Sequence, residues 1–292
     1  MPSRASPRPP SLTVARQRAI VSFVPSIAPR VNILGVGISA VTIEAAVTAV
    51  GDSIASRSRE YVCVVPAHSV MECVRDPSLR PVFNGAAMCT PDGMSIVWLL
   101  RLHGHKGVSR VYGPDLLHAV CERSIATGWR HFFVGGVEGV ADGLVLRLKE
   151  KYPGLAVAGT LSPPFRKLAP AEDDEMVTAI NAGQPDIVWV GLGSPKQERW
   201  MAGHAGRISA PAMIGIGAAF DFLSRRKAQA PRWMQRSGLE WLFRWAHEPR
   251  RLSPRYARYP LFAALVLAQT LGLVRYETSG TPIDGEPRRN SR

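Results

Sequence analysis

The chain has 292 residues, of which 46% are hydrophobic, and it carries a formal net charge of +13. This hydrophobic fraction is typical of a globular protein and excludes a low-complexity, disordered body. Residues 31–224 are nearly neutral, with 17 Lys and Arg against 18 Asp and Glu, whereas residues 225–258 hold ten basic and two acidic residues. Because the positive charge lies outside the neutral body, we expect an anionic partner, either a membrane surface or a nucleic acid.

The N-terminal residues 1–30 are rich in Pro, Ser and Arg and contain five Arg and no acidic residue. We expect them to form a disordered, basic segment, and we expect residues 277–292 to form a disordered tail. No stretch reaches the roughly 18 apolar residues that a membrane-spanning helix needs, although residues 261–274 come closest. The prediction is therefore a body over residues 31–224 followed by a helical appendage over residues 225–276.

Short apolar runs alternate with helical patterns through the body. Strands are predicted at residues 61–65, 131–134, 187–190 and 212–216, and helices between them at residues 139–151 and 171–182. Continuous apolar strands that alternate with helices are typical of a parallel sheet covered on both faces. The body is thus predicted to be an α/β domain with a mostly parallel sheet and helices on both faces.

Three of the predicted strands end in glycine-rich turns. Because ligands of open parallel sheets bind at the carboxyl ends of the strands, these turns would line one crevice. Glycine lets the backbone approach a phosphate, and the next helix offers free N–H groups, although such turns also serve simple chain reversals. The candidate donor-binding residues are Gly135, Gly136, Gly139, Gly193, Pro195, Lys196, Gln197, Glu198, Phe220 and Asp221. The pattern is not GxGxxG, so no nicotinamide cofactor is indicated.

Asp92 lies in the sharpest short motif, Thr90-Pro91-Asp92-Gly93. Proline restricts the backbone before the acid and glycine permits a turn directly after it, so the carboxylate would be held rigidly near a helix start. A carboxylate in such a turn is a candidate general base, but it also suits a helix cap. The residues alone leave both roles open.

Two further motifs carry groups suited to a nucleotide diphosphate. Arg110 opens the turn RVYG and has the geometry for two parallel hydrogen bonds to a phosphate, although the residues alone favour a solvated surface arginine somewhat more. Lys196 suits a phosphate, and Gln197 suits a sugar hydroxyl or a uracil edge. An ordinary first helical turn would explain the same residues.

Residues 232–248 show polar side chains at helical spacing, with tryptophans over the remaining surface. This pattern predicts one amphipathic helix suited to the headgroup boundary of a membrane. A helix docked on the core, with its arginines in solvent, is the alternative. The candidate acceptor- and membrane-contacting residues are Arg232, Trp233, Arg236, Trp241, Arg250 and Arg251.

Taken in order, the motifs TPDG, RVYG, GGVEG, GLGSPKQE, GIGAAFDF and APRWMQRSGLEWLFRWAHEPRRL resemble the WecG/TagA/CpsF family of bacterial glycosyltransferases over about residues 31–256. Members transfer sugars from UDP-sugars to undecaprenyl-diphosphate-linked acceptors at the cytoplasmic membrane face. The resemblance implies a Rossmann-like fold and an inverting, metal-independent reaction. It also implies a cytoplasmic protein held peripherally on the inner face of the plasma membrane, and it leaves a homo-oligomer open.

The resemblance assigns roles to single residues. Asp92 matches the family's proposed base, Arg110 an arginine near the active site, and Gln197 a glutamine of the pocket. The Arg and Trp residues of the basic segment match a C-terminal appendage that contacts the membrane. The chain departs from the family's Thr-x-Asn motif, because Pro66-Ala67-His68 stands there, so His68 is taken as a candidate for that part of the site. A histidine packed at the end of a strand is an equal alternative. We expect an exopolysaccharide pathway from this variant and the long tail.

Three other functions explain the sequence less well than glycosyl transfer does. A nucleic-acid-binding protein would interleave basic and aromatic residues across a folded face, but this body is neutral, so no nucleic-acid partner is expected. An epimerase or dehydrogenase would need a dinucleotide fingerprint. A non-catalytic, membrane-associated scaffold explains the tail but not Asp92. The sequence contains no DxD motif, no CxxC pair and no His cluster at metal spacing, so neither a metal nor another cofactor is expected.

Overall fold

The computed structural model describes residues 28–166, 168–224 and 226–278. Within these residues, six parallel strands form one sheet in the order β4-β3-β8-β7-β5-β6. The strands are β3 (Glu60–Val65), β4 (Met88–Pro91), β5 (His131–Gly135), β6 (Val157–Leu161), β7 (Ile187–Gly191) and β8 (Ala212–Gly215). The predicted parallel sheet is confirmed. The segments predicted to be disordered lie largely outside the described residues, up to residue 27 and from residue 279.

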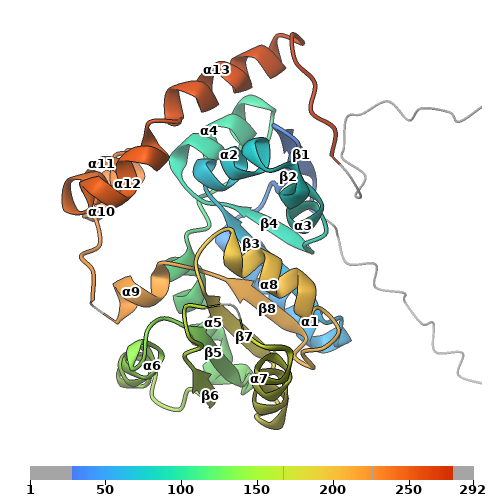
Figure 1. The fold of residues 1–292 in the computed structure, drawn as a ribbon, viewed down its shortest axis with the longest axis vertical. Helices are drawn as coiled ribbons and strands as arrows, with labels where there is room; N and C mark the ends of the chain where they lie inside the picture. Colours follow the sequence, from blue (N-terminus) through green and yellow to red (C-terminus); the bar gives the residue numbers. More distant parts are fainter. Residues whose placement is uncertain (1–27, 167, 225, 279–292) are drawn as a thin grey trace, which may run out of the picture.

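Helices cover both faces of this sheet (Figure 1). In β3, Cys63 and Val65 belong to the core layer under α2 (Ala67–Arg75), α7 (Pro170–Ala182) and α8 (Lys196–His204). Val62 and Val64 alternate with them and belong to the opposite layer. That layer lies under α1 (Ile43–Ser56), α5 (Gly113–Thr127), α6 (Val140–Lys151) and α9 (Ala219–Leu223). This alternation explains why the strands read as continuous apolar runs.

Local signals set the ends of several helices. Thr42 caps α1, because its side-chain hydroxyl accepts a hydrogen bond from the Ala45 N–H at 3.2 Å. In α5, Pro114 stands in the first turn, where its missing N–H costs nothing, and Gly128 ends the helix in the left-handed region. Two shorter helices, α3 (Arg80–Asn84) and α4 (Met94–Leu102), pack on the same side as α2, and a 3-10 turn (η1, Pro77–Leu79) precedes α3.

An antiparallel hairpin precedes the sheet and was not predicted. It consists of β1 (Arg30–Ile33) and β2 (Val36–Ser39). Leu34 and Gly35 both have positive φ values, 51° and 89°, which is the backbone conformation of a two-residue hairpin loop. Gly35 suits its position, but leucine is rare at a positive φ, so no standard turn signal marks this hairpin in the sequence.

The chain after α9 forms the C-terminal appendage, with α10 (Arg232–Arg236), α11 (Glu240–His247), α12 (Pro249–Tyr256) and α13 (Tyr259–Thr270). The prediction of one continuous helix over residues 232–248 was wrong. Gly238 has a φ of 77°, in the left-handed region that an α-helix cannot continue through, so α10 ends and α11 begins anew after it. Among the described helices, none is both long and apolar enough to cross a bilayer.

The appendage is joined to the N-terminal half of the body at its far end. The Gln269 side chain of α13 accepts from the Leu34 N–H at 2.9 Å and donates to the Asn32 carbonyl at 3.1 Å. Arg258 forms an ion pair with Glu72 of α2 at 2.8 Å. Figure 1 shows α13 (red) running across the end of the molecule beside α2 and α4. The appendage is thus fixed along α13 as well as where it leaves α9.

Candidate active site

A cavity of about 570 Å³ opens at the carboxyl end of the sheet. The strand register brings the ends of neighbouring strands together there, because Val65 pairs with Pro91 and Val190 pairs with Gly215. This is the edge at which ligands of open parallel sheets bind. The predicted site residues that line the cavity are His68, Asp92, Gly136, Gly193, Gln197, Phe220, Asp221 and Arg251.

Asp92 is held at this edge by its backbone and by one carboxylate oxygen. Its N–H donates to the Val65 carbonyl of the neighbouring strand at 3.2 Å, and Gly93, with a φ of 84°, turns the chain into α4. Gly93, and not Asp92, occupies the N-cap position of α4, so the helix-cap role is wrong. Arg110 donates to Oδ1 through Nε at 3.0 Å and lies 2.9 Å from it through a terminal nitrogen. Within the described residues, Oδ2 has no hydrogen-bond partner.

Arg110 lies between two carboxylates. Its guanidinium donates to Glu240 of α11 at 2.7 Å as well as to Asp92, and it stacks over the Tyr112 ring at 4.1 Å. Its side chain is only 14% exposed, so it is not a solvated surface arginine. Burial alone would lower the pKa of Arg110, but the two carboxylates raise it above its usual value. Arg110 is therefore a permanent cation engaged by Asp92 and Glu240, and it lies outside the lining of the cavity.

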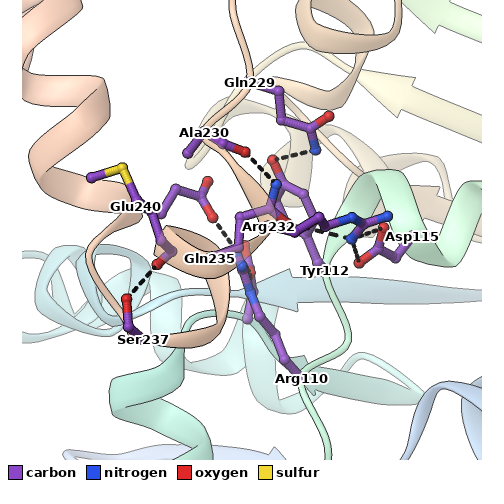
Figure 2. A network of polar contacts seen from close by, with 11 residues as sticks. Arg110, Tyr112, Asp115, Gln229, Ala230, Arg232, Gln235, Ser237 and Glu240 are labelled. Atoms are coloured by element: carbon purple, nitrogen blue, oxygen red, sulfur yellow. Dashed lines mark hydrogen bonds and ion pairs between the residues drawn. The ribbon is translucent and has the colours of Figure 1, made fainter.

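Further contacts join the first part of the appendage to Arg110, Tyr112 and the first turn of α5 (Figure 2). Gln229 donates to the Tyr112 hydroxyl at 3.3 Å, and Arg232 donates to the Asp115 carboxylate at 2.9 Å. The Arg110–Glu240 pair completes this set. Together these contacts place the appendage directly beside Asp92.

His68 is the second residue of α2 and lines the cavity near Asp92. Burial, and then the positive charges of Arg255 and Arg244, lower the pKa of His68 well below its usual value. The imidazole is therefore neutral at physiological pH and offers one N–H donor and one nitrogen acceptor. Its side chain has no hydrogen bond to any residue that the structure describes, so both groups remain available to a ligand.

Basic side chains of the appendage also line this cavity. Lys227 lies 3.1 Å from Asp221 and 3.4 Å from Glu248, so it joins α9 to the appendage. Arg251 also pairs with Glu248, at 2.8 Å through a terminal nitrogen. Cations gathered on one wall suit a diphosphate. The full basic lining is Arg226, Lys227, Arg244, Arg251 and Arg255.

Gln197 presents an unpaired acceptor. The side chain is 3% exposed, and its Nε2 donates to Glu198 Oε1 at 3.0 Å. Its Oε1 is buried without a hydrogen-bond partner, which is rare because buried polar atoms are normally paired. Burial raises the pKa of Glu198, against the hydrogen bonds from Gln197 and Ser194. Glu198 thus orients the Gln197 amide so that its oxygen can accept a hydrogen bond from a bound ligand.

The remaining predicted residues do not line this cavity. Lys196 is exposed at the start of α8, so the phosphate contact predicted for it has no support in its position. Trp233 is 63% exposed on the appendage, and Trp241 lines a neighbouring apolar cavity. The others outside the lining are Gly135, Gly139, Pro195, Glu198, Arg232, Arg236 and Arg250.

Several residues of the site and its surroundings were not predicted from the sequence. Glu240 and Glu248 are the two acids of the basic segment 225–258, and both pair inward with cations. Isolated acids in a strongly basic segment were therefore a usable signal. The missed lining residues of the cavity include Ser69, Tyr112, Phe165, Lys227, Arg244 and Arg255. In the described parts of the chain, no group of three or more His, Cys, Asp or Glu side chains could hold a metal ion.

Comparisons with known proteins agree with this architecture. The family description "Glycosyl transferase WecG/TagA/CpsF family" matches residues 31–276. An N-acetylglucosaminyldiphosphoundecaprenol N-acetyl-beta-D-mannosaminyltransferase of Bacillus spizizenii is 30% identical over 196 residues, 67% of this chain and 74% of that protein. The enzyme of the same name from Staphylococcus aureus strain MW2 is 23% identical over 235 residues, 80% of this chain and 90% of that protein. The chain therefore belongs to the WecG/TagA/CpsF family of glycosyltransferases.

Proposed function

We propose that the protein transfers a hexose-type sugar from a UDP-sugar to a polyprenyl-diphosphate-linked sugar, in the synthesis of an exopolysaccharide or another cell-surface glycan. The relatives named above, which act on N-acetylglucosaminyldiphosphoundecaprenol, support this class of acceptor. The observation that carries the proposal is the state of Asp92. One oxygen of its carboxylate is anchored by Arg110, and the other has no partner among the described residues.

The reaction is a single displacement at the anomeric carbon of the donor. The acceptor hydroxyl loses its proton to Asp92 as its oxygen forms a bond to that carbon. The bond between the anomeric carbon and the diphosphate oxygen breaks, and its electron pair leaves with UDP. Attack opposite the leaving group inverts the configuration, so an α-linked donor gives a β-linked product. Neutral His68 can hold a sugar hydroxyl beside the base.

The leaving diphosphate gains negative charge, and stabilising that charge is the second requirement of the reaction. Lys227, Arg251 and Arg255 line the cavity and supply positive charge there. The Gln197 oxygen, unpaired within the described residues, offers an acceptor to a donor hydroxyl or to the uracil N–H. In this proposal the cations of the appendage take the part that a metal ion plays in other transferases.

The test is transfer from a panel of UDP-sugars to a short-chain polyprenyl-diphosphate-N-acetylglucosamine, followed by NMR of the product linkage. We expect turnover with one donor and a β-linkage from an α-donor. Asp92→Asn should lower kcat by roughly 10²- to 10⁴-fold, the usual contribution of a general base. Asp52→Asn on α1 is the matched control, with full activity and an unchanged melting temperature expected. Activity of Asp92→Asn within a few-fold of wild type would remove Asp92 from the mechanism.

Metal independence has a separate test. We expect initial rates to be unchanged after dialysis against EDTA, because the charge on the leaving group is met by side chains. The measurement compares rates with EDTA, with Mg²⁺ and with Mn²⁺ at equal ionic strength. Activity that is lost under chelation and restored by either ion would refute this part of the proposal.

A further inference from the structure

A second cavity, of about 620 Å³, adjoins the first one at Asp92. Pro66, His68, Asp92 and Arg244 line both cavities, so the two spaces meet at the proposed base. A volume of this size lies within the range of pockets that enclose small organic ligands. The mechanism above makes no use of this second space.

The walls of the second cavity are mostly apolar. One wall is α4, with Met94, Trp98 and Leu99, and the facing wall is α13, with Phe262 and Val266. The polar end lies at Asp92, where Arg110 bridges to Glu240. We call this space, between α4 and α13 and closed by α11 at the Asp92 end, the apolar cleft. Its lining therefore changes from charged to apolar with distance from the proposed base.

The other end of the cleft carries large apolar side chains that are open to solvent. Trp98 is 48% exposed, Leu102 is 81% exposed and Leu267 is 60% exposed, and all three line the cleft. Leu261 and Leu271 extend this surface along α13. In Figure 1, α4 and α13 lie at the end of the molecule farthest from α6 and α7. Contiguous exposed apolar side chains of this kind mark a lipid or protein contact surface.

We propose that the apolar cleft holds the first isoprene units of the acceptor's lipid tail. This inference rests on the proposed function, because it takes the acceptor to be a polyprenyl diphosphate. Such a molecule has a sugar, a diphosphate and an apolar chain in that order. Where the two cavities meet, the protein presents a carboxylate at Asp92 and a cation at Arg244, and the apolar walls lie beyond them. The occupant is a chain covalently continuous with the reacting sugar, because the cleft is continuous with the reaction centre.

The experiment measures binding, so it needs no turnover. Isothermal titration calorimetry of the full chain, with saturating UDP in the donor site, compares farnesyl diphosphate with inorganic diphosphate. The wild-type protein should bind farnesyl diphosphate at least tenfold more tightly than inorganic diphosphate, because the isoprene units of the ligand move from water into the cleft. Ala263 lines the cleft from α13, and Ala263→Trp fills its mouth. The preference for farnesyl diphosphate should fall to less than threefold in this variant.

Two further variants keep the outcome decisive. Ala264→Trp is the matched control, since Ala264 is exposed on the same helix but does not line the cleft, and it should keep the wild-type preference. Ser95→Trp fills the cleft from the α4 side and should behave like Ala263→Trp. Equal binding of the two ligands by wild type, or an equal loss in Ala264→Trp, overturns the inference. Because transfer is measured separately, a failure of the cleft and a failure of the proposed reaction are distinguishable.

Discussion

His131 shows how the sheet accommodates a polar ring in its core. Its Nδ1 accepts from the Trp189 indole N–H at 2.9 Å, and its Nε2 lies 2.9 Å from the Ser124 hydroxyl. Ser124 in turn donates to the Val120 carbonyl, so the ring is best satisfied as a neutral imidazole with its proton on Nε2. Burial lowers the pKa of His131 to about 4.

Because the pKa of His131 is lowered in the folded state, the unfolding free energy depends on pH. The folded state excludes the proton that the unfolded chain binds near pH 6.5, so the stabilisation is present above that pH and is lost as pH falls toward 4. Between pH 8 and pH 4, wild type should lose on the order of 3 kcal/mol more unfolding free energy than His131→Leu. Urea unfolding of both proteins across this range is the measurement. Parallel pH curves would contradict the prediction.

At the scale of single residues, the sequence predicted a role for Asp92 but not the side chains that pair with it. Thr90-Pro91-Asp92-Gly93 predicted a rigid turn, because proline and glycine restrict and release the backbone at fixed positions. The bond to Arg110 spans 18 residues and that from Arg110 to Glu240 spans 130, and no local pattern encodes either. The charges were visible in the sequence, whereas their pairing depends on how the appendage packs.

At the scale of elements, strands were predictable and the appendage was less so. Buried parallel strands carry an apolar signal in every residue, so four of the six described sheet strands were found from their continuous apolar runs. The appendage shows polar residues at helical spacing, but spacing does not say whether a polar stripe faces water or the body. Glu240 is 9% exposed and faces Arg110, so this stripe includes an internal ion pair.

The contact between α11 and the body predicts a measurable coupling. Glu240→Ala leaves the buried Arg110 with one carboxylate, and we expect it to lower the unfolding free energy by about 1.5–3 kcal/mol, the usual range for a hydrogen bond to a charged group. It should also speed proteolysis around residues 226–231, because the appendage is held there by fewer contacts. Chemical denaturation and limited trypsin digestion measure the two effects.

A surface ion pair supplies the control for this experiment. Asp76 and Arg199 are paired at 2.7 Å, but both side chains are 45% exposed. Asp76 also caps η1, so the control removes its partner: Arg199→Ala should change the unfolding free energy by less than about 1 kcal/mol. Equal effects of Glu240→Ala and Arg199→Ala would show that the Arg110 bridge does not hold the appendage.

At the scale of the whole molecule, charge and apolar surface gather toward one end. The appendage carries exposed cations, including Arg236 and Arg250, and exposed tryptophans such as Trp233. We propose that this end rests on an anionic membrane, where each nearby cation contributes about 1 kcal/mol. The neutral body, with α6 at its other end, would then face away from the lipid (Figure 1).

Co-sedimentation with phosphatidylglycerol-containing vesicles tests this orientation. Removing two cations in Arg236→Ala/Arg250→Ala should weaken partitioning roughly thirtyfold, the equivalent of about 2 kcal/mol. The matched control is Lys149→Ala/Lys151→Ala on α6, which removes the same charge from the opposite end and should leave partitioning within twofold of wild type. An equal loss in both double variants would mean that net charge, and not this face, governs membrane binding.

The bonds between Gln269 and the first hairpin bear on how the protein is made. Asn32 and Gln269 are 237 residues apart, so these bonds can form only after residue 269 has left the ribosome. The sheet is complete well before that point, since its last strand, β8, ends at Gly215. The residues of the sheet therefore leave the ribosome before α13 does, so the apolar α13 is free to meet a bilayer before it docks on the hairpin.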